Sequence, residues 1–241
     1  SGRTVYLSVS RGFKAGGFNP AAPAGSEDYG EEHAWNAEGG VKTLWANGRV
    51  SANAAVFRIS WDDMQLNVPN PYVPAQFFIA NVGHATSTGF ELDVNARPRA
   101  GVDLFGTFGL THGRFGAGSR SSGVDVTGNE LPNAPGYTAS LGLQCTQGVG
   151  RSMSGFGRAE VVFYGAYHYD DLNSAGQDAY VLANLRAGLR IGRVLVEGWV
   201  KNAFDTRYIP VAFAYAGLAP SGFLGENGRP RTFGVTTRVV F

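Results

Sequence analysis

The stretch PRTFGVTTRVVF, residues 230–241, decides the fold of this chain. Its alternate residues Phe233, Val235, Val239 and Phe241 are apolar, and most of the residues between them are small or polar. A period of two residues is typical of a β-strand with one apolar and one polar face. In water such a strand would expose an apolar face and a free edge, which favours aggregation. The stretch therefore predicts a strand that meets lipid and closes a barrel against the first strand of the chain.

The same alternation recurs along the whole chain. It is clearest in residues 180–191, whose apolar positions are Val181, Ala183, Leu185, Ala187, Leu189 and Ile191. About ten such strands are expected, joined by connections that alternate between long and short, which is the pattern of outer-membrane barrels. We expect long loops at 12–32, 62–75, 113–135, 170–178 and 206–229, with short turns at 46–48, 98–101, 148–152 and 192–193. The predicted fold class is all-β: a transmembrane antiparallel up-and-down β-barrel of about ten strands, with apolar stripes facing outward and charged stripes inside.

Composition excludes several other classes of protein. The 241 residues carry a formal net charge of +1, so charge does not imply a nucleic-acid partner. Charged residues make up only 16% of the chain, and no run approaches the roughly 18 apolar residues of a spanning helix. Cys145 has no second cysteine with which to form a disulfide, and the four histidines lack metal-ligand spacing. No metal, cofactor or nucleic acid is therefore expected.

One predicted strand has an irregular pattern. From Val50 to Val56 the even-numbered positions are apolar, and then the apolar set changes to Phe57, Ile59 and Trp61. This switch predicts a β-bulge near Val56 and Phe57, or the point at which the strand leaves the bilayer.

Five short motifs carry a resemblance to a known family. In chain order they are SRGFKAGGFN at 10–19, GFEL at 89–92, LPNAP at 131–135, NAFD at 202–205 followed by Tyr208, and PRTFG at 230–234. Together they resemble the strand ends and pre-strand turns of TonB-dependent outer-membrane receptors, in family order and over nearly the whole chain. The last strand, with Phe233, Val235, Val239 and Phe241, is similar to the signal that the barrel-assembly machinery reads.

The resemblance implies that family members are longer than these 241 residues and contain further strands and a second domain. Family members have a 22-stranded barrel filled by an amino-terminal plug domain, and they take up scarce external ligands with energy from the TonB complex. Residues 1–241 then correspond to the carboxyl-terminal part of the barrel domain, without the plug, in the outer membrane of a Gram-negative bacterium. The ligand class implied first is a siderophore-type iron complex. A longer receptor and a naturally truncated barrel are both compatible with this sequence.

The resemblance places ligand contacts in the external loops and the upper lumen. Aromatic side chains suit this role because they offer rigid contact area and a polar tip. The candidates are Phe18, Tyr29, Trp61, Tyr72, His112, Tyr169 and Tyr215; each also fits the aromatic girdle of any such barrel. The charged residues Arg158, Glu160, Arg186, Arg190, Glu197 and Lys201 are expected to line the lumen and to face the plug.

Two other functions fit the pattern. A small barrel that closes on itself would act as a passive pore. A hydrolase with its site at the barrel rim is the third reading, because Asp170 and Asp171 lie close to His168. Neither reading has a motif of its own, so no catalytic residue is assigned.

Overall fold

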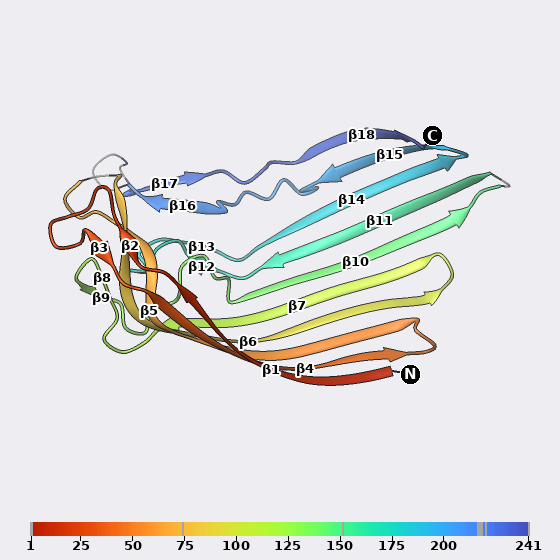
Figure 1. The fold of residues 1–241 in the computed structure, drawn as a ribbon. Coiled ribbons are helices and arrows are strands. Elements are labelled where there is room, and N and C mark those ends of the chain that lie inside the picture. Colours follow the sequence, from red (N-terminus) through yellow and green to blue (C-terminus); the bar gives the residue numbers. More distant parts are fainter. Residues whose placement is uncertain (1, 74, 151, 216–218, 220, 241) are drawn as a thin grey trace.

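The computed structural model describes residues 2–73, 75–150, 152–215, 219 and 221–240, and it is dominated by one antiparallel sheet of ten strands (Figure 1). In spatial order these are β1 (Gly2–Lys14), β4 (Glu32–Trp45), β5 (Val50–Pro69), β6 (Phe77–Arg99), β7 (Val102–Phe115), β10 (Tyr137–Gly148), β11 (Met153–Tyr164), β14 (Tyr180–Ile191), β15 (Val194–Lys201) and β18 (Thr232–Val239). Each strand pairs with its neighbour along the chain, so the predicted up-and-down order is confirmed. No helix among the described residues is long and apolar enough to cross a membrane.

The connections differ sharply between the two ends of the sheet. Short turns lie at the end that holds both termini, whereas long loops gather at the other end (Figure 1). In the turn that follows β4, Ala46, Asn47 and Gly48 all have positive φ, which suits the predicted tight turn. The long loops contain four two-stranded hairpins: β2 (Gly17–Phe18) with β3 (Asp28–Tyr29), β8 (Arg120–Ser121) with β9 (Val124–Asp125), β12 (Tyr167–His168) with β13 (Gly176–Gln177), and β16 (Val211–Ala214) with β17 (Phe223–Glu226).

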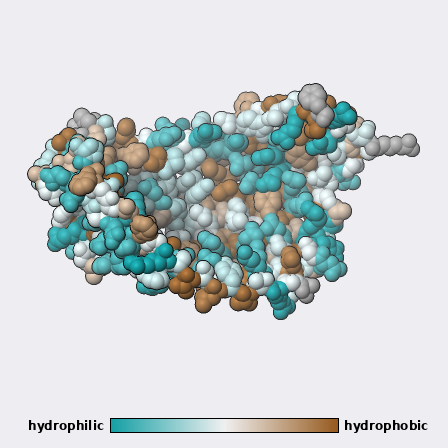
Figure 2. Space-filling model, in the orientation of Figure 1, coloured by the Kyte–Doolittle hydropathy of each residue, from teal (hydrophilic) through white to brown (hydrophobic). Residues whose placement is uncertain are grey.

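The two faces of the sheet have opposite character. On one face, which we call the outer face, apolar side chains are widely exposed: Val5 is 81% and Leu7 80% accessible. The strand register continues this stripe across the sheet, for example along Leu143, Ala159 and Leu185 of β10, β11 and β14. Figure 2 shows hydrophobic side chains gathered along one edge of the molecule, over β1 and β4, where this stripe comes into view.

The inner face carries most of the charged residues of the strands and a repeated aromatic contact. At five places an aromatic ring lies over a glycine directly opposite it on the next strand, where an added Cβ would collide with the ring. The pairs are Tyr6 with Gly40, Phe57 with Gly89, Phe105 with Gly142, Phe156 with Gly188, and Trp199 with Gly234. Rings that lie flat along the wall cover the neighbouring backbone and hold adjacent strands together.

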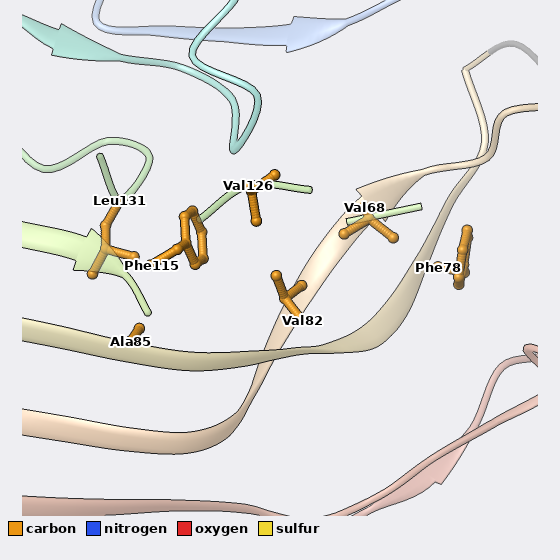
Figure 3. Packing of buried hydrophobic residues seen from close by; sticks show 7 residues of the cluster. All are labelled: Val68, Phe78, Val82, Ala85, Phe115, Val126 and Leu131. Atoms are coloured by element: carbon orange, nitrogen blue, oxygen red, sulfur yellow. The ribbon is translucent and has the colours of Figure 1, made fainter. Parts of the chain in front are cut away.

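The densely packed apolar core lies at the loop end and not between sheet layers. The seven residues of the main cluster are Val68, Phe78, Val82, Ala85, Phe115, Val126 and Leu131, and they point toward one another in Figure 3. A second cluster contains Tyr167, Tyr169 and Ala212. We call this packed loop region the cap; it covers the loop end of the inner face, because Ala85 and Phe115 lie opposite each other on that face of β6 and β7.

The structure corrects the predicted bulge in β5. Pairing of β5 with β6 runs without a break through Val56 and Phe57, and the register shifts only between Trp61 and Gln65. The apolar set changes because Phe57 covers Gly89 and Trp61 packs against the cap, so apolar residues occupy the inner face there. The predicted loop at 62–75 is also wrong over most of its length, since β5 continues to Pro69 and β6 begins at Phe77.

The predicted closure against the first strand is wrong for this chain. β1 and β18 form the two edges of the sheet, and among the described residues neither pairs with the other. The ten strands form an open sheet, as expected for a segment of a barrel with more strands, because barrel diameter grows with strand number. The reading as a small pore that closes on itself loses its basis with this observation.

Candidate functional site

Four loops meet at one cavity in the cap. The extended β5–β6 hairpin leans across the loop end of the sheet toward the β16–β17 hairpin (Figure 1), and the rings of Phe77 and Phe213 meet edge to face with centroids 6.5 Å apart. The cavity beside them has a volume of about 510 Å³. Its lining is Leu66, Asn67, Pro69 and Phe77 from the β5–β6 hairpin, Pro132 and Asn133 before β10, Tyr169, Asp170 and Asp171 after β12, and Ala212, Phe213 and Ala214 of β16. A concave, mostly apolar site with a few polar groups is the usual form of a small-molecule site.

Tyrosines fix one wall of this cavity. The hydroxyl of Tyr169 donates to the carbonyl oxygen of Ile209 at 2.8 Å, and that of Tyr167 donates to the carbonyl oxygen of Pro210 at 3.0 Å. The two rings meet edge to face at 5.7 Å. Burial raises the pKa of both phenols above their ordinary value, so both stay protonated donors at neutral pH. These bonds tie the last long loop to the β12–β13 hairpin.

The two adjacent acids have different environments. Asp170 caps its own turn: its carboxylate accepts from the backbone N–H of Ser174 at 2.9 Å and from the Ser174 hydroxyl at 2.6 Å. Asp171 is only 7% accessible, and its buried Oδ2 has no hydrogen-bond partner among the described residues. Because buried polar atoms are nearly always hydrogen-bonded, Asp171 is the side chain of this cavity best suited to accept a bond from a ligand.

The geometry does not build a hydrolase site from these residues. The acid that faces His168 is Glu130, with its Oε2 3.8 Å from Nε2, which is beyond hydrogen-bond distance. The carboxylate of Asp170 already accepts two hydrogen bonds from Ser174. It therefore does not orient a histidine as a catalytic triad requires. Among the described residues no group of three or more His, Cys, Asp or Glu is arranged to hold a metal ion.

The predicted aromatic candidates are scattered, and only Tyr169 lines the cavity. Trp61 packs against the main cap cluster, and Tyr215 closes the β16–β17 hairpin through its N–H bond to Gly222. Phe18 and Tyr29 lie in the β2–β3 hairpin, and Tyr72 is an exposed loop residue. His112 lies on the outer face, in register with Thr88, and so points away from the cap.

Sequence reasoning missed Phe77, Asn133 and Phe213. No periodic signal could have grouped them, because they come from three separate segments: the start of β6, the connection before β10, and β16. It also missed a stack of three tyrosine rings on the inner side of the wall: Tyr164 on Tyr180 at 4.8 Å and Tyr180 on Tyr208 at 4.6 Å.

The charged residues of the later strands lie on the inner face, as predicted. Arg158 is 3.6 Å from Glu160 on its own strand and lies over the ring of Phe105 at 4.1 Å. Arg186 is directly opposite Arg158 in the register of β11 and β14.

In the last strand Phe233, Val235 and Val239 are exposed on the outer face, while Phe241 lies outside the described residues.

Comparison with known proteins gives one consistent result. The family described as "TonB dependent receptor-like, beta-barrel" matches residues 1–203. The pesticin receptor of Yersinia pestis is 28% identical over 244 residues, which are 98% of this chain and 34% of that protein. The crystal structure of the ferric yersiniabactin uptake receptor FyuA from Yersinia pestis superposes with a TM-score of 0.84 and 26% identity, over 99% of this chain and 35% of that one.

A more distant structure shows the same fold. The siderophore receptor PiuA from Acinetobacter baumannii superposes with a TM-score of 0.74 and 20% identity, over 98% of this chain and 33% of that chain. The chain therefore spans about a third of the length of the relatives that it matches.

Proposed function

Because this chain belongs to the TonB-dependent receptor β-barrel family, we propose that it forms part of an outer-membrane receptor for a scarce external ligand, a siderophore-type iron complex. The family consists of outer-membrane receptors of Gram-negative bacteria and not of enzymes, so no catalytic role is assigned. The relatives named above as receptors for ferric yersiniabactin and for siderophores support this ligand class.

The receptor in this proposal contains more strands than the sequence given. Its 241 residues form one continuous piece of barrel domain, and further strands pair with the free edges of β1 and β18. A plug domain fills the lumen against the inner face, where Arg158, Glu160, Arg186 and Glu197 lie. Lumenal charges need partners or water, so the plug supplies polar contacts to this wall. Uptake draws energy from the TonB complex, and the last strand is read by the barrel-assembly machinery.

The cavity shared by four loops carries the proposal. Its walls are apolar and aromatic, and its buried acid Asp171 lacks a partner within the described residues. Loops held together by a packed cap can be preorganised for a ligand, which lowers the entropy cost of binding. In this proposal the other aromatic candidates, Phe18, Tyr29, Trp61, Tyr72, His112 and Tyr215, contribute to the approach of the ligand or to the girdle.

The test compares cavity variants with a loop variant outside the cavity. In the intact receptor, Phe213→Ala and Asp171→Asn should each weaken binding of ferric siderophores about tenfold or more, measured by titration of the purified protein. Phe204→Ala is the matched control, because Phe204 is an exposed aromatic residue that does not line the cavity. Uptake of radiolabelled iron should fall in parallel, and removal of TonB should abolish uptake while leaving binding intact. Equal affinities of the cavity and control variants would refute this location.

A further inference from the structure

Tryptophans mark both boundaries of the apolar outer face. On β4, Trp45 and Trp35 point outward from opposite ends of the strand, ten positions apart. At about 3.3 Å per residue and the usual tilt, this separation matches the apolar band of about 25 Å in outer-membrane barrels. An arginine of β1 lies over the ring of each tryptophan. The guanidinium carbon of Arg3 is 4.6 Å from the ring centroid of Trp45, and that of Arg11 is 5.7 Å from the ring centroid of Trp35. Trp35 therefore marks the boundary at the loop end.

At that boundary the outer face becomes basic. The register places Arg58, Thr88 and His112 side by side on β5, β6 and β7. The next row toward the loops runs from Arg11 through Trp35, Ser60 and Thr86 to Arg114. These two rows contain four basic side chains, three hydroxyls and no acid. We call this set, Arg11, Arg58, Ser60, Thr86, Thr88, His112 and Arg114, the outer basic patch.

Two of the arginines are free to bind an anion. Arg114 is engaged with the carbonyl oxygen of Gly128 at 2.6 Å and with Glu130 at 3.3 Å. Arg58 is exposed, and within the described part of the chain it makes no ion pair or side-chain hydrogen bond; Arg11 is also exposed and has only Trp35 beneath it. The nearby acids are paired elsewhere, Asp62 with His84 at 2.9 Å and Glu31 with His33 at 3.1 Å.

The patch is local to one side of the wall. Tyr137, Phe163, Val181 and Phe233 occupy outward positions near the loop ends of β10, β11, β14 and β18, and all four are apolar or aromatic. A girdle common to the whole barrel would distribute its basic residues over all strands, so the clustering on β1, β5 and β7 indicates a specific site. His112 contributes a donor, because its Nε2 accepts from Arg114 Nε at 3.0 Å and its Nδ1 then carries the proton.

We propose that the outer basic patch binds the phosphate group of a lipid in the outer leaflet. Arg58 and Arg11 supply charge-assisted hydrogen bonds to phosphate oxygens, and the hydroxyls of Thr88 and Ser60 and the imidazole of His112 complete the set of donors. The occupant is an amphiphile and not free phosphate, because the patch continues directly into exposed apolar residues. Val56 precedes Arg58 on the same face and is 58% accessible, so acyl chains can lie against it. This site is independent of the ligand cavity in the cap.

The experiment measures retention of a phosphorylated lipid by the intact receptor. The probe is diphosphoryl lipid A in mixed detergent micelles, and retained lipid is counted by native mass spectrometry. We expect Arg58→Gln and Arg11→Gln each to reduce lipid affinity about fivefold, which corresponds to ~1 kcal/mol for one arginine at a membrane surface. Arg3→Gln is the matched control, because Arg3 lies over a tryptophan at the opposite boundary and should leave retention unchanged.

Three outcomes would overturn the proposal. They are equal retention by Arg58→Gln and Arg3→Gln, equal retention of the same lipid after its phosphates are removed, and full competition by inorganic phosphate at millimolar concentration. Heat-modifiable migration of each variant in gels checks that the barrel is folded. The uptake assay for the external ligand gives a separate readout, which these variants should leave unchanged.

Discussion

The strand wall and the cap use the same apolar residue types in opposite ways. In the wall, Val5 is 81% accessible and its neighbours on the outer face form an exposed stripe. In the cap, Val68 is 1% and Val126 0% accessible, and both belong to a packed cluster. The wall is stable only where hydrocarbon surrounds it, whereas the cap extends beyond the membrane and must bury its apolar side chains as a water-soluble domain does.

This difference sorts the effects of substitutions by region and not by residue type. A cavity in the cap removes packing that nothing replaces, whereas lipid fills the space left by a trimmed side chain on the outer face. A charge is harmless on the inner face and costly on the outer one. The predictions below test this comparison, from the largest expected effect to the smallest.

The largest effect is expected for Phe115→Ala. Phe115 is 3% accessible in the main cap cluster, and truncating a buried phenylalanine costs about 3–5 kcal/mol. Hydrogen exchange of cap amides such as that of Val126, which bonds Ser119, should accelerate strongly. Phe108→Ala is the control, because Phe108 lies on the outer face and does not contact the cap. If hydrogen exchange in the cap were as slow in Phe115→Ala as in Phe108→Ala, the assignment of Phe115 to a tightly packed cluster would be wrong.

A charge at the middle of the wall should have the next largest effect. Leu141→Arg places a guanidinium on the outer face of β10 and should reduce the free energy of unfolding by ~2–4 kcal/mol. Thr138→Arg, on the inner face of the same strand, should cost far less, because its charge reaches water and the acid Glu91 lies in the same row. Denaturant titration of protein folded in lipid vesicles measures both. A reversed ranking would show that the faces have been assigned the wrong way round.

The aromatic–glycine pairs should be sensitive to one methyl group. In Gly142→Ala the new Cβ collides with the ring of Phe105, and overpacking of this kind costs about 1–3 kcal/mol. Gly157→Ala on the neighbouring strand has no atom within 4 Å of the added Cβ and should be nearly neutral. The same vesicle titrations compare the two. A double variant, Gly142→Ala with Phe105→Leu, should recover part of the loss if the ring is the cause.

The smallest effect concerns alkaline pH, and Tyr169 in the cap provides its test. Burial raises the pKa of Tyr169 above its ordinary value of about 10, so the folded cap favours the neutral phenol. The resulting stabilisation is fully present below pH 10 and is lost as pH rises through the folded-state pKa. Tyrosinate absorbance of wild type and Tyr169→Phe should locate this late titration. Tyr72→Phe, at an exposed position, is the control and should leave this late titration in place.

How far the sequence predicts the structure differs between these regions. Residues 180–191 were expected as one strand and are β14 with the same bounds, because a strand with one face in hydrocarbon must alternate. The switch at Val56 and Phe57 was read as a bulge or as the point where the strand leaves the bilayer. Only the bulge is wrong, because local pattern does not distinguish an irregular strand from one whose inner face is also apolar. Among the predicted ligand residues only Tyr169 lines the cavity, and Phe77 and Phe213 were not expected there.

The sequence by itself determined the strands, their two faces, the tight turns and the alternation of long and short connections. Each of these follows from interactions within a few residues and from the solvent that each face meets. Only the tertiary structure decided the open arc of the sheet, the packed cap and the meeting of four loops around Asp171. These features depend on contacts between segments far apart in the chain, and the free energy of such contacts leaves no periodic trace in the sequence.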